Sequence, residues 1–571
     1  MSDKKSGQVL GGSTTDQEHL MNEIGSTLTS GRRGFVGALG AGGLGMLFAK
    51  TAGAVTNGPL NPTQRRDKAY SIRTARALTN RNAAPLTPQS TNGDEEQHAN
   101  KIGNSTKALP HNSRGEVNID AYNTFDYALR VGTDAAFEAI TLGGIRKLAN
   151  PQSGLAFEMD GGDCQSFRMA PPPKFTSREI AAEISENYWM ALLRDVPFSQ
   201  YATNPIAIDA AADLTLWGAD AKVPKDASGV VTPDLLFRGP SAGDRVGPYT
   251  SQFLLLPCPF GPTFIEQRTL QPVAGVNFMT DFTSFLSSQN GAGGLPPITF
   301  ENTLKYVRNG RGLGDWVHLD FSYQAYLQAL LVLGSIGAQF DPGIPYVSAK
   351  KQGGVATFSI LHVGALMAEV SSQALRAAWY QKWFSHRRLR PEAYAGAVHT
   401  RLYQSTTGDG SQDRFPVHAD ILSSVSSSTR LGKYLPAGNA VLPMAYPEGS
   451  PTHPAYPAGH PAVAGACVTI MKAFYNESFV IPNPRQPSDD GLSLESYTGA
   501  PLTVGGELNK LANNVGLGRN IAGMHWRSDA TGALLLGEAV AIQLLAEQRA
   551  LFNEPFNGFT ITKFDGTTVT I

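Results

Sequence analysis

The sequence has 571 residues, 42% of them hydrophobic, which is enough for a large buried core and for about two to four domains of ordinary size. Its 47 basic and 48 acidic residues give a formal net charge of −1. This balance argues against a nucleic-acid partner, which requires a strong basic excess. Any anion site must therefore be a local cluster of basic residues.

The first 54 residues are similar to a bacterial twin-arginine export signal. Arg32 and Arg33 precede a Gly/Ala/Leu-rich stretch that ends near Ala49, and Ala52-Gly53-Ala54 offers small residues for cleavage. The stretch is too short for a comfortable membrane span. We expect an exported protein, periplasmic or secreted and not integral to the membrane. The alternative is a flexible Gly/Ala tail with a chance arginine pair.

Residues 55–115 are polar and rich in Asn, Thr, Pro and Arg, which predicts an extended N-terminal arm. From residue 116 to 571 helical periodicity recurs between Pro- and Gly-rich connections. The predicted helices are Ile119 to Leu148, Ser177 to Leu193, Trp316 to Gln339, Phe358 to His386, His460 to Tyr475 and two within Glu507 to Phe552. Alternating runs around Asp565-Gly566 predict a C-terminal β-hairpin. The expected fold is mainly α, a helical bundle with long loops and this small hairpin.

The three cysteines are Cys164, Cys258 and Cys467. They form no CxxC or zinc-type spacing, which argues against a thiolate metal site. One disulfide would be compatible with an oxidising compartment, but the sequence cannot pair three cysteines.

The first segment that carries chemistry runs from Trp379 to Pro391. It contains the basic or potentially basic residues Lys382, His386, Arg387, Arg388 and Arg390. Proline cannot continue a helix and disfavours helical geometry in the residue before it, so we expect Arg390 at a helix end, free to turn towards Lys382. The alternative is a solvated basic face, which is the more common outcome for a run of charges.

The second segment runs from His453 to His460 and consists mainly of Pro, Ala and Gly. Ala458 and Gly459 precede an apolar run that predicts a helix. A helix N-terminus that follows a glycine is a favourable anion site, with His460 at its mouth. The alternative is a Pro/Gly turn with a structural histidine.

The third segment contains Arg519, His525 and Asp529. His525 and Asp529 are four residues apart, so one helix face would carry both. A carboxylate there can hold the ring N–H of His525 and fix its tautomer. The alternative is a surface helix with a simple His–Asp pair.

Together the three segments offer a concentrated set of donors for one tetrahedral oxyanion. Arginine forks match phosphate-like oxygens, and histidine can ligate a metal or move a proton. The segments lack the carboxylate cluster that magnesium or two-metal phosphatases need. The sequence therefore predicts an anion held by protein cations, within residues 379–529.

In this order, the segments resemble the vanadium-dependent haloperoxidase and type 2 phosphatidic acid phosphatase superfamily, whose signature is K-x6-RP, PSGH and SR-x5-H-x3-D. The first motif here reads Lys382-x7-Arg390-Pro391, one residue longer than the phosphatase spacing. That spacing, the long gap to Pro457 and the upstream His453 are most similar to the red-algal and cyanobacterial bromoperoxidase branch.

The resemblance implies that vanadate is the cofactor and that His525 is its direct metal ligand. It implies that vanadate oxygens are held by Lys382, Arg390, Arg519, His460 and the main-chain amide of Gly459. His460 would take a proton from hydrogen peroxide, and Lys382 would polarise a peroxide oxygen. The supporting residues would be Trp379, His386, His453, Ala458 and Asp529.

The implied activity is oxidation of bromide or iodide by hydrogen peroxide to hypohalous acid, which halogenates small organic nucleophiles. Trp379 is shared with the fungal chloroperoxidases and His453 is typical of bromoperoxidases, so chloride is a further candidate. Relatives in this branch are often dimers or larger, so we expect a homo-oligomer.

The sequence departs from the family pattern at Ala458, where PSGH has serine. The lost hydroxyl removes one donor to a vanadate oxygen, which would cost roughly 1–3 kcal/mol if that oxygen stays unpaired. Gly518 replaces the serine of the SR pair, at a flanking position.

Three alternatives remain. A phosphate-ester hydrolase would use the same oxyanion geometry, although the longer Lys–Arg spacing and the lack of membrane helices count against a lipid phosphatase. A vanadate-independent homologue is kept open by Ala458. An exported protein that only binds an anion would show binding without turnover.

Overall fold

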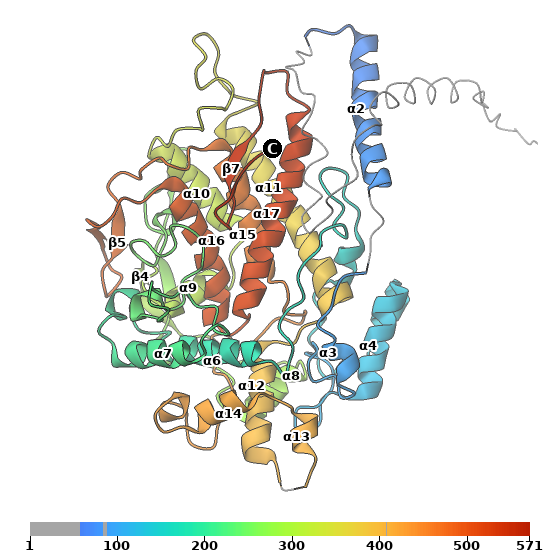
Figure 1. Ribbon diagram of the computed structural model, residues 1–571, viewed down its shortest axis with the longest axis vertical. Coiled ribbons are helices and arrows are strands. Elements are labelled where there is room, and N and C mark those ends of the chain that lie inside the picture. The colour runs from blue at the N-terminus through green and yellow to red at the C-terminus, as the bar shows by residue number, and fades with distance from the viewer. Residues whose placement is uncertain (1–57, 84–87, 407) are drawn as a thin grey trace, which may run out of the picture. The chain divides into compact units, whose positions relative to one another are not determined.

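The computed structural model describes residues 58–83, 88–406 and 408–571 (Figure 1). The predicted export signal, residues 1–54, lies outside the described residues. The fold is mainly helical, as predicted. The helices are α2 (Pro62–Asn82), α3 (Asp94–Gln97), α4 (Ile119–Val131), α5 (Asp134–Glu138), α6 (Arg178–Leu192), α7 (Pro205–Leu216), α8 (Phe282–Gln289), α9 (Gly310–Trp316), α10 (Gln324–Ser335), α11 (Ile360–Tyr380), α12 (Pro391–His399), α13 (Ser411–Arg414), α14 (Ala419–Ser426), α15 (Gly459–Phe474), α16 (Val504–Ile521) and α17 (Arg527–Arg549).

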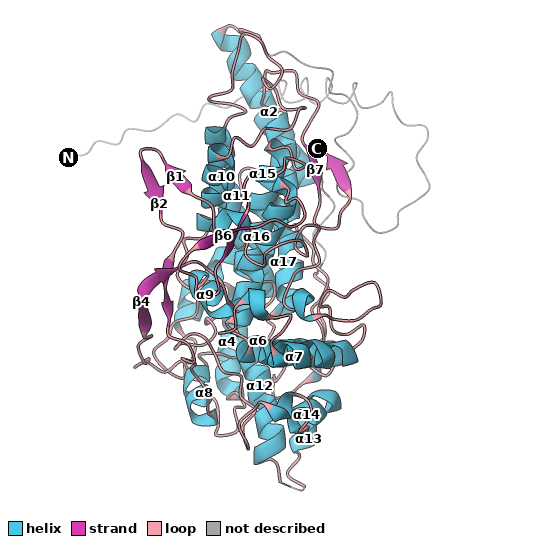
Figure 2. Ribbon diagram, turned by 90° about the vertical axis from the view of Figure 1, so that its left-hand side faces the viewer, coloured by secondary structure: helices cyan, strands magenta, loops and turns pink. Residues whose placement is uncertain are grey.

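The centre of the molecule is a bundle in which α15 packs against α11, α16 and α17. Figures 1 and 2 both show these helices running side by side, with α10 beside them and α6 lying across one end. α15 is buried along nearly its whole length. A helix that is apolar all round belongs inside a bundle, and this one supplies the middle of the hydrophobic core.

The two central helices meet through glycine. A Cβ atom added to Gly465 of α15 would lie 2.1 Å from the carbonyl oxygen of Leu534 in α17, and one added to Gly537 of α17 would lie 1.9 Å from that of Ala462 in α15. Neither position has room for a side chain. The backbones of α15 and α17 therefore contact each other directly.

Strands are short and few in the described part of the chain. They pair as four antiparallel two-stranded sheets, β1 (Cys258–Phe260) with β2 (Thr263–Ile265), β3 (Thr269–Pro272) with β4 (Phe300–Lys305), β5 (Arg485–Pro487) with β6 (Leu494–Ser496), and β7 (Thr560–Thr562) with β8 (Thr568–Thr570). β7 and β8 form the predicted C-terminal hairpin, in which Ile561 pairs with Val569. The other three sheets were not predicted.

The prediction of an extended arm over residues 55–115 is wrong. Pro62–Asn82 forms α2, which begins with a capping box in which the side chains of Asn61 and Gln64 accept each other's main-chain N–H groups. Its sequence is mostly polar and none of its residues is buried. The apolar periodicity from which the other helices were predicted is therefore missing here. Beyond α2 the chain packs into the protein, where buried Lys107 forms an ion pair with Glu392.

Helix boundaries follow local signals. Ser177 caps α6 by accepting the N–H of Ile180, and α4 ends at Gly132, which has a φ of 71°. Glycine adopts this left-handed conformation easily and commonly ends helices. The predicted helix from Ile119 to Leu148 is therefore too long.

Among the described residues, α17 is the one helix long and apolar enough to cross a membrane by length and composition. Its most apolar window is 61% buried inside the protein. The three cysteines are also buried and unpaired.

Candidate active site

The three predicted segments meet at one end of the bundle. Lys382 lies in a short π-helix (Gln381–His386) that follows α11, and Arg390 is the residue before α12. Gly459 and His460 begin α15. Arg519 lies in the last turn of α16, and His525 lies between α16 and α17. Lys382, Arg390, Arg519 and His525 are all buried, so the sequence segments assemble into an interior site.

His525 is held by the carboxylate four residues later. Its Nδ1 lies 2.9 Å from Oδ2 of Asp529, which also accepts the main-chain N–H of Trp526 at 3.1 Å. A carboxylate at Nδ1 keeps the ring proton there and leaves Nε2 with its lone pair. The Nη1 group of Arg390 lies 3.0 Å from that Nε2. His525 therefore presents Nε2 to the basic cluster, where Arg390 is its partner.

The basic side chains are held by main-chain carbonyl groups and not by carboxylates. Lys382 donates to the carbonyl oxygens of Pro454 and Ala455 at 2.9 and 3.0 Å. Arg390 donates to those of His453 and Met524. Arg519 donates to the carbonyl of Val317 at 2.8 Å, and its buried Nε has no partner in the described part of the chain.

This arrangement leaves positive charges close together. Burial, then the neighbouring Arg390, lowers the pKa of Lys382 well below its usual value. Burial also lowers the pKa of Arg390 to about 9, and the pKa of His525 falls for the same reason and because of Arg390 and Lys382. A bound anion would relieve this repulsion, because opposite charges attract strongly where water is excluded.

His453 and Trp379 complete one wall of the site. His453 Nδ1 lies 3.0 Å from Nη2 of Arg390, and its ring centre is 4.8 Å from that of Trp379. The ammonium group of Lys382 lies over the Trp379 ring at 5.7 Å. These aromatic groups limit the space beside Lys382.

His460 faces the more open side of the site. Its side chain is 29% exposed, whereas that of His525 is 2% exposed. The Nε2 atom of His460 lies 2.8 Å from Oδ1 of Asp320. No sequence motif indicated Asp320, which lies 140 residues away in the loop between α9 and α10. This carboxylate orients the His460 ring.

Comparison with known proteins agrees with the motifs. The profile of the VCPO second helical-bundle domain matches residues 362–554. The vanadium-dependent bromoperoxidase of Corallina pilulifera is 35% identical over 90% of this chain and 100% of its own length. That of Ascophyllum nodosum is 34% identical over 90% of this chain and 95% of its own length. The chain belongs to the vanadium-dependent haloperoxidase family.

A solved structure resembles this chain over nearly its whole length. The second vanadate-dependent bromoperoxidase of Ascophyllum nodosum, described as homohexameric, matches with a TM-score of 0.80 and 29% identity. The match covers 96% of this chain and 95% of that one. The resemblance stated from the sequence motifs is confirmed.

The donor set suits the oxyanion that this family uses. The described residues contain no group of three or more His, Cys, Asp or Glu side chains placed to hold a metal cation. What they provide is the Nε2 atom of His525 among three buried basic side chains, Lys382, Arg390 and Arg519. That combination fits vanadate, which is an anion whose metal accepts an imidazole nitrogen.

Ala458 is the main departure from the family motif. It is fully buried at the N-cap of α15 and supplies no side-chain acceptor for the first turn of that helix. Its main-chain N–H donates to the carbonyl of Asp529 at 3.2 Å, which ties α15 to α17.

We expect Ala458→Ser to bind vanadate about 10-fold more tightly, because the added hydroxyl can donate to a charged oxygen and such a bond contributes about 1.5 kcal/mol or more. Titration of the vanadate-free protein with orthovanadate measures the effect. Ala458→Gly is the control, since it adds no donor. Equal affinity in the serine and glycine variants would show that the missing hydroxyl is unimportant.

His386 does not join the cluster. Its ring packs edge-on against Tyr456 with centres 4.9 Å apart, and neither ring nitrogen has a hydrogen-bond partner among the described residues. Burial lowers its pKa to about 4. The supporting role proposed for His386 is therefore to pack against Tyr456 beside the basic cluster.

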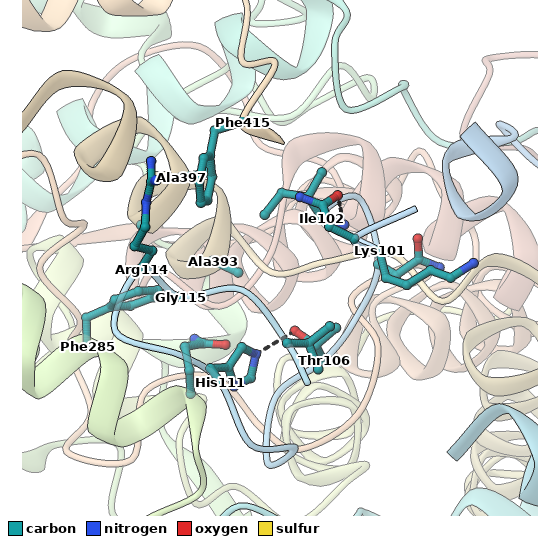
Figure 3. Close-up of a pocket in the computed structure, with 15 residues that line it drawn as sticks. Lys101, Ile102, Thr106, His111, Arg114, Gly115, Phe285, Ala393, Ala397 and Phe415 are labelled. Atoms are coloured by element: carbon teal, nitrogen blue, oxygen red, sulfur yellow. Dashed lines mark hydrogen bonds between the residues drawn. The ribbon is translucent and has the colours of Figure 1, made fainter. Parts of the chain in front are cut away.

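Two cavities lie away from this site. One, of about 20 Å³, is lined by residues of the 100–117 segment, α8 and α12 (Figure 3). There the ring of His111 points towards Thr106, 2.9 Å from its hydroxyl. The other, of about 340 Å³, lies near the start of α16. None of the motif residues lines either cavity.

Proposed function

We propose that this protein binds vanadate and uses hydrogen peroxide to oxidise bromide and iodide to hypohalous acid, which then halogenates small organic nucleophiles. The observation that carries this proposal is the Nε2 atom of His525, which lies 3.0 Å from Nη1 of Arg390 among the buried side chains of Lys382, Arg390 and Arg519, while Asp529 holds Nδ1. When bound, vanadate supplies a Lewis acid that activates peroxide without changing its own oxidation state.

The residues have separate tasks in this reaction. His525 would ligate the metal through Nε2, Arg390 and Arg519 would neutralise oxyanion charge, and the Gly459 amide would donate a hydrogen bond to an oxyanion oxygen. His460, held by Asp320, would accept a proton from incoming hydrogen peroxide. Lys382, buried and carrying three donors, would withdraw electron density from a peroxide oxygen so that halide can attack it.

The decisive experiment starts with purified protein freed of vanadate. Half is incubated with orthovanadate, excess is removed, and bromination of a chromogenic acceptor is followed with peroxide, with and without bromide. Activity that needs vanadate, peroxide and bromide together supports the proposal. No bromination at any vanadate concentration would contradict it, and hydrolysis of a phosphate ester would then favour the phosphatase alternative.

Three further features belong to the same proposal. Bromide and iodide are the expected halides because His453 is typical of bromoperoxidases, and chloride is the one to test beside them. The homohexameric relative from Ascophyllum nodosum supports assembly of this chain into a homo-oligomer, which light scattering would measure. Export by the twin-arginine route, proposed from Arg32 and Arg33, would be tested by locating the protein after Arg32→Lys and Arg33→Lys substitution.

A further inference from the structure

Behind His525 lies a buried network of ion pairs. Arg388 donates from Nη1 to Oδ1 of Asp529 at 2.7 Å and from Nη2 to Oε2 of Glu183 at 2.8 Å. Nη1 also donates to the hydroxyl of Ser528 at 2.7 Å. The two oxygens of Asp529 therefore have different partners, because Oδ2 takes the N–H of His525 and Oδ1 takes the guanidinium of Arg388.

Burial makes this contact important. Arg388 is 2% exposed, Asp529 is 0% and Glu183 is 3%. A buried carboxylate without a cation is strongly unfavourable. Arg388 reaches Asp529 within salt-bridge distance, and no other lysine or arginine in the described part of the chain does so. The orientation of the Asp529 carboxylate is therefore fixed from behind by Arg388.

The main chain beside Arg388 connects the same two segments. The carbonyl of Leu389 accepts the indole N–H of Trp526 at 2.9 Å, and Arg388 lies over the Trp526 ring at 4.8 Å. Two residues after Arg388, the side chain of Arg390 reaches the opposite side of His525, at Nε2. Arg388 and Arg390 thus hold the Asp529–His525 pair from its two ends.

We infer that Arg388 is a positioning residue for the metal ligand. By fixing Asp529, it holds the His525 ring so that Nε2 points into the cluster of Lys382, Arg390 and Arg519. The inference rests on the proposed function, since it concerns the affinity of that site for vanadate. The two neighbouring arginines serve elsewhere, because Arg387 pairs with Glu95 and Arg527 pairs with Glu186.

The test compares Arg388→Gln with Arg527→Gln. Arg527 is a matched control because it is also buried, donates twice to one carboxylate and lies near His525, yet does not contact Asp529. Both variants should lose thermal stability. We expect vanadate affinity, measured on vanadate-free protein, to fall about 10- to 100-fold in Arg388→Gln and to stay at the wild-type value in Arg527→Gln.

Halide oxidation gives a second readout. At saturating vanadate the kcat of Arg388→Gln should approach that of the wild-type protein, with an unchanged KM for bromide. The reason is that the substitution affects how firmly His525 is held in position. If Arg388→Gln fails to fold, Arg388→Gln combined with Glu183→Gln removes both charges of one pair and should show the same loss of affinity.

Unchanged vanadate affinity in either Arg388 variant, or an equal loss in Arg527→Gln, would overturn the inference. Wild-type protein that binds no vanadate would overturn the proposed function as well. The two failures are distinguishable because the second appears in the wild-type measurement and the first only in the variants.

Discussion

Replacement of His525 by alanine is expected to weaken vanadate binding more than 100-fold, beyond the roughly 10- to 100-fold range known for residues that only support a ligand. The imidazole Nε2 is directed into the cluster of basic side chains, and Asp529 at Nδ1 leaves the lone pair on Nε2. Without the ring, the cluster retains only hydrogen bonds and charge for an oxyanion.

Equilibrium titration of the vanadate-free variant with orthovanadate measures this loss, and bromination should fall with it. His362→Gln is a control, since that half-buried histidine packs against Phe474 and belongs to no motif. A His525→Ala protein that retains wild-type affinity would show that the anion is held by Lys382, Arg390 and Arg519 alone. The assignment of His525 as metal ligand would then be wrong.

Replacement of His460 by glutamine should lower kcat for bromide oxidation by about 100- to 10,000-fold, the usual contribution of a well-placed acid–base group. Vanadate affinity should change far less, because Lys382, Arg390, Arg519 and His525 remain. Glutamine keeps the length and polarity of the side chain but cannot take up a proton near neutral pH.

Steady-state rates at saturating vanadate and peroxide separate the two effects. Asp320→Asn is the informative companion, since it keeps a hydrogen-bond acceptor for His460 while removing the charge. It should lower kcat less than His460→Gln does. If His460→Gln brominates as fast as the wild-type protein, another group must take the proton from hydrogen peroxide.

Much of the helical core could be predicted from the sequence, because the caps and apolar runs that indicate its helices are local signals. Ser177 caps α6 where predicted, and the apolar run after His460 forms α15 within one residue of the predicted end. α2 was missed because none of its residues is buried, so its signals were confined to its start, where Asn61 caps the helix and Pro62 opens it. The small sheet of β3 with β4 pairs residues 28 or more positions apart, with α8 between the two strands, and its irregular register has no simple pattern.

The contacts of the site also fall into two groups, those within one sequence segment and those between distant segments. His525 lies just before the N-cap of α17 and Asp529 lies in the first turn of that helix, so a four-residue spacing was enough to predict their contact although His525 is not itself helical. The bonds of His460 to Asp320 and of Arg388 to Glu183 join residues 140 and 205 positions apart. Neither carboxylate lies in a motif. Such partners follow from the crossing of helices and loops, which local periodicity does not specify.

The glycine contacts between α15 and α17 bear on how this catalyst could be adapted. Because Gly465 and Gly537 let the two backbones touch, the spacing between the start of α15, with His460, and the start of α17, with Asp529, is set by a stiff helix pair. Surface loops around the site can therefore accept insertions or new side chains while the reacting groups keep their separation. Directed evolution of acceptor selectivity should accordingly find tolerated changes in the loops, and Gly465 or Gly537 should resist replacement.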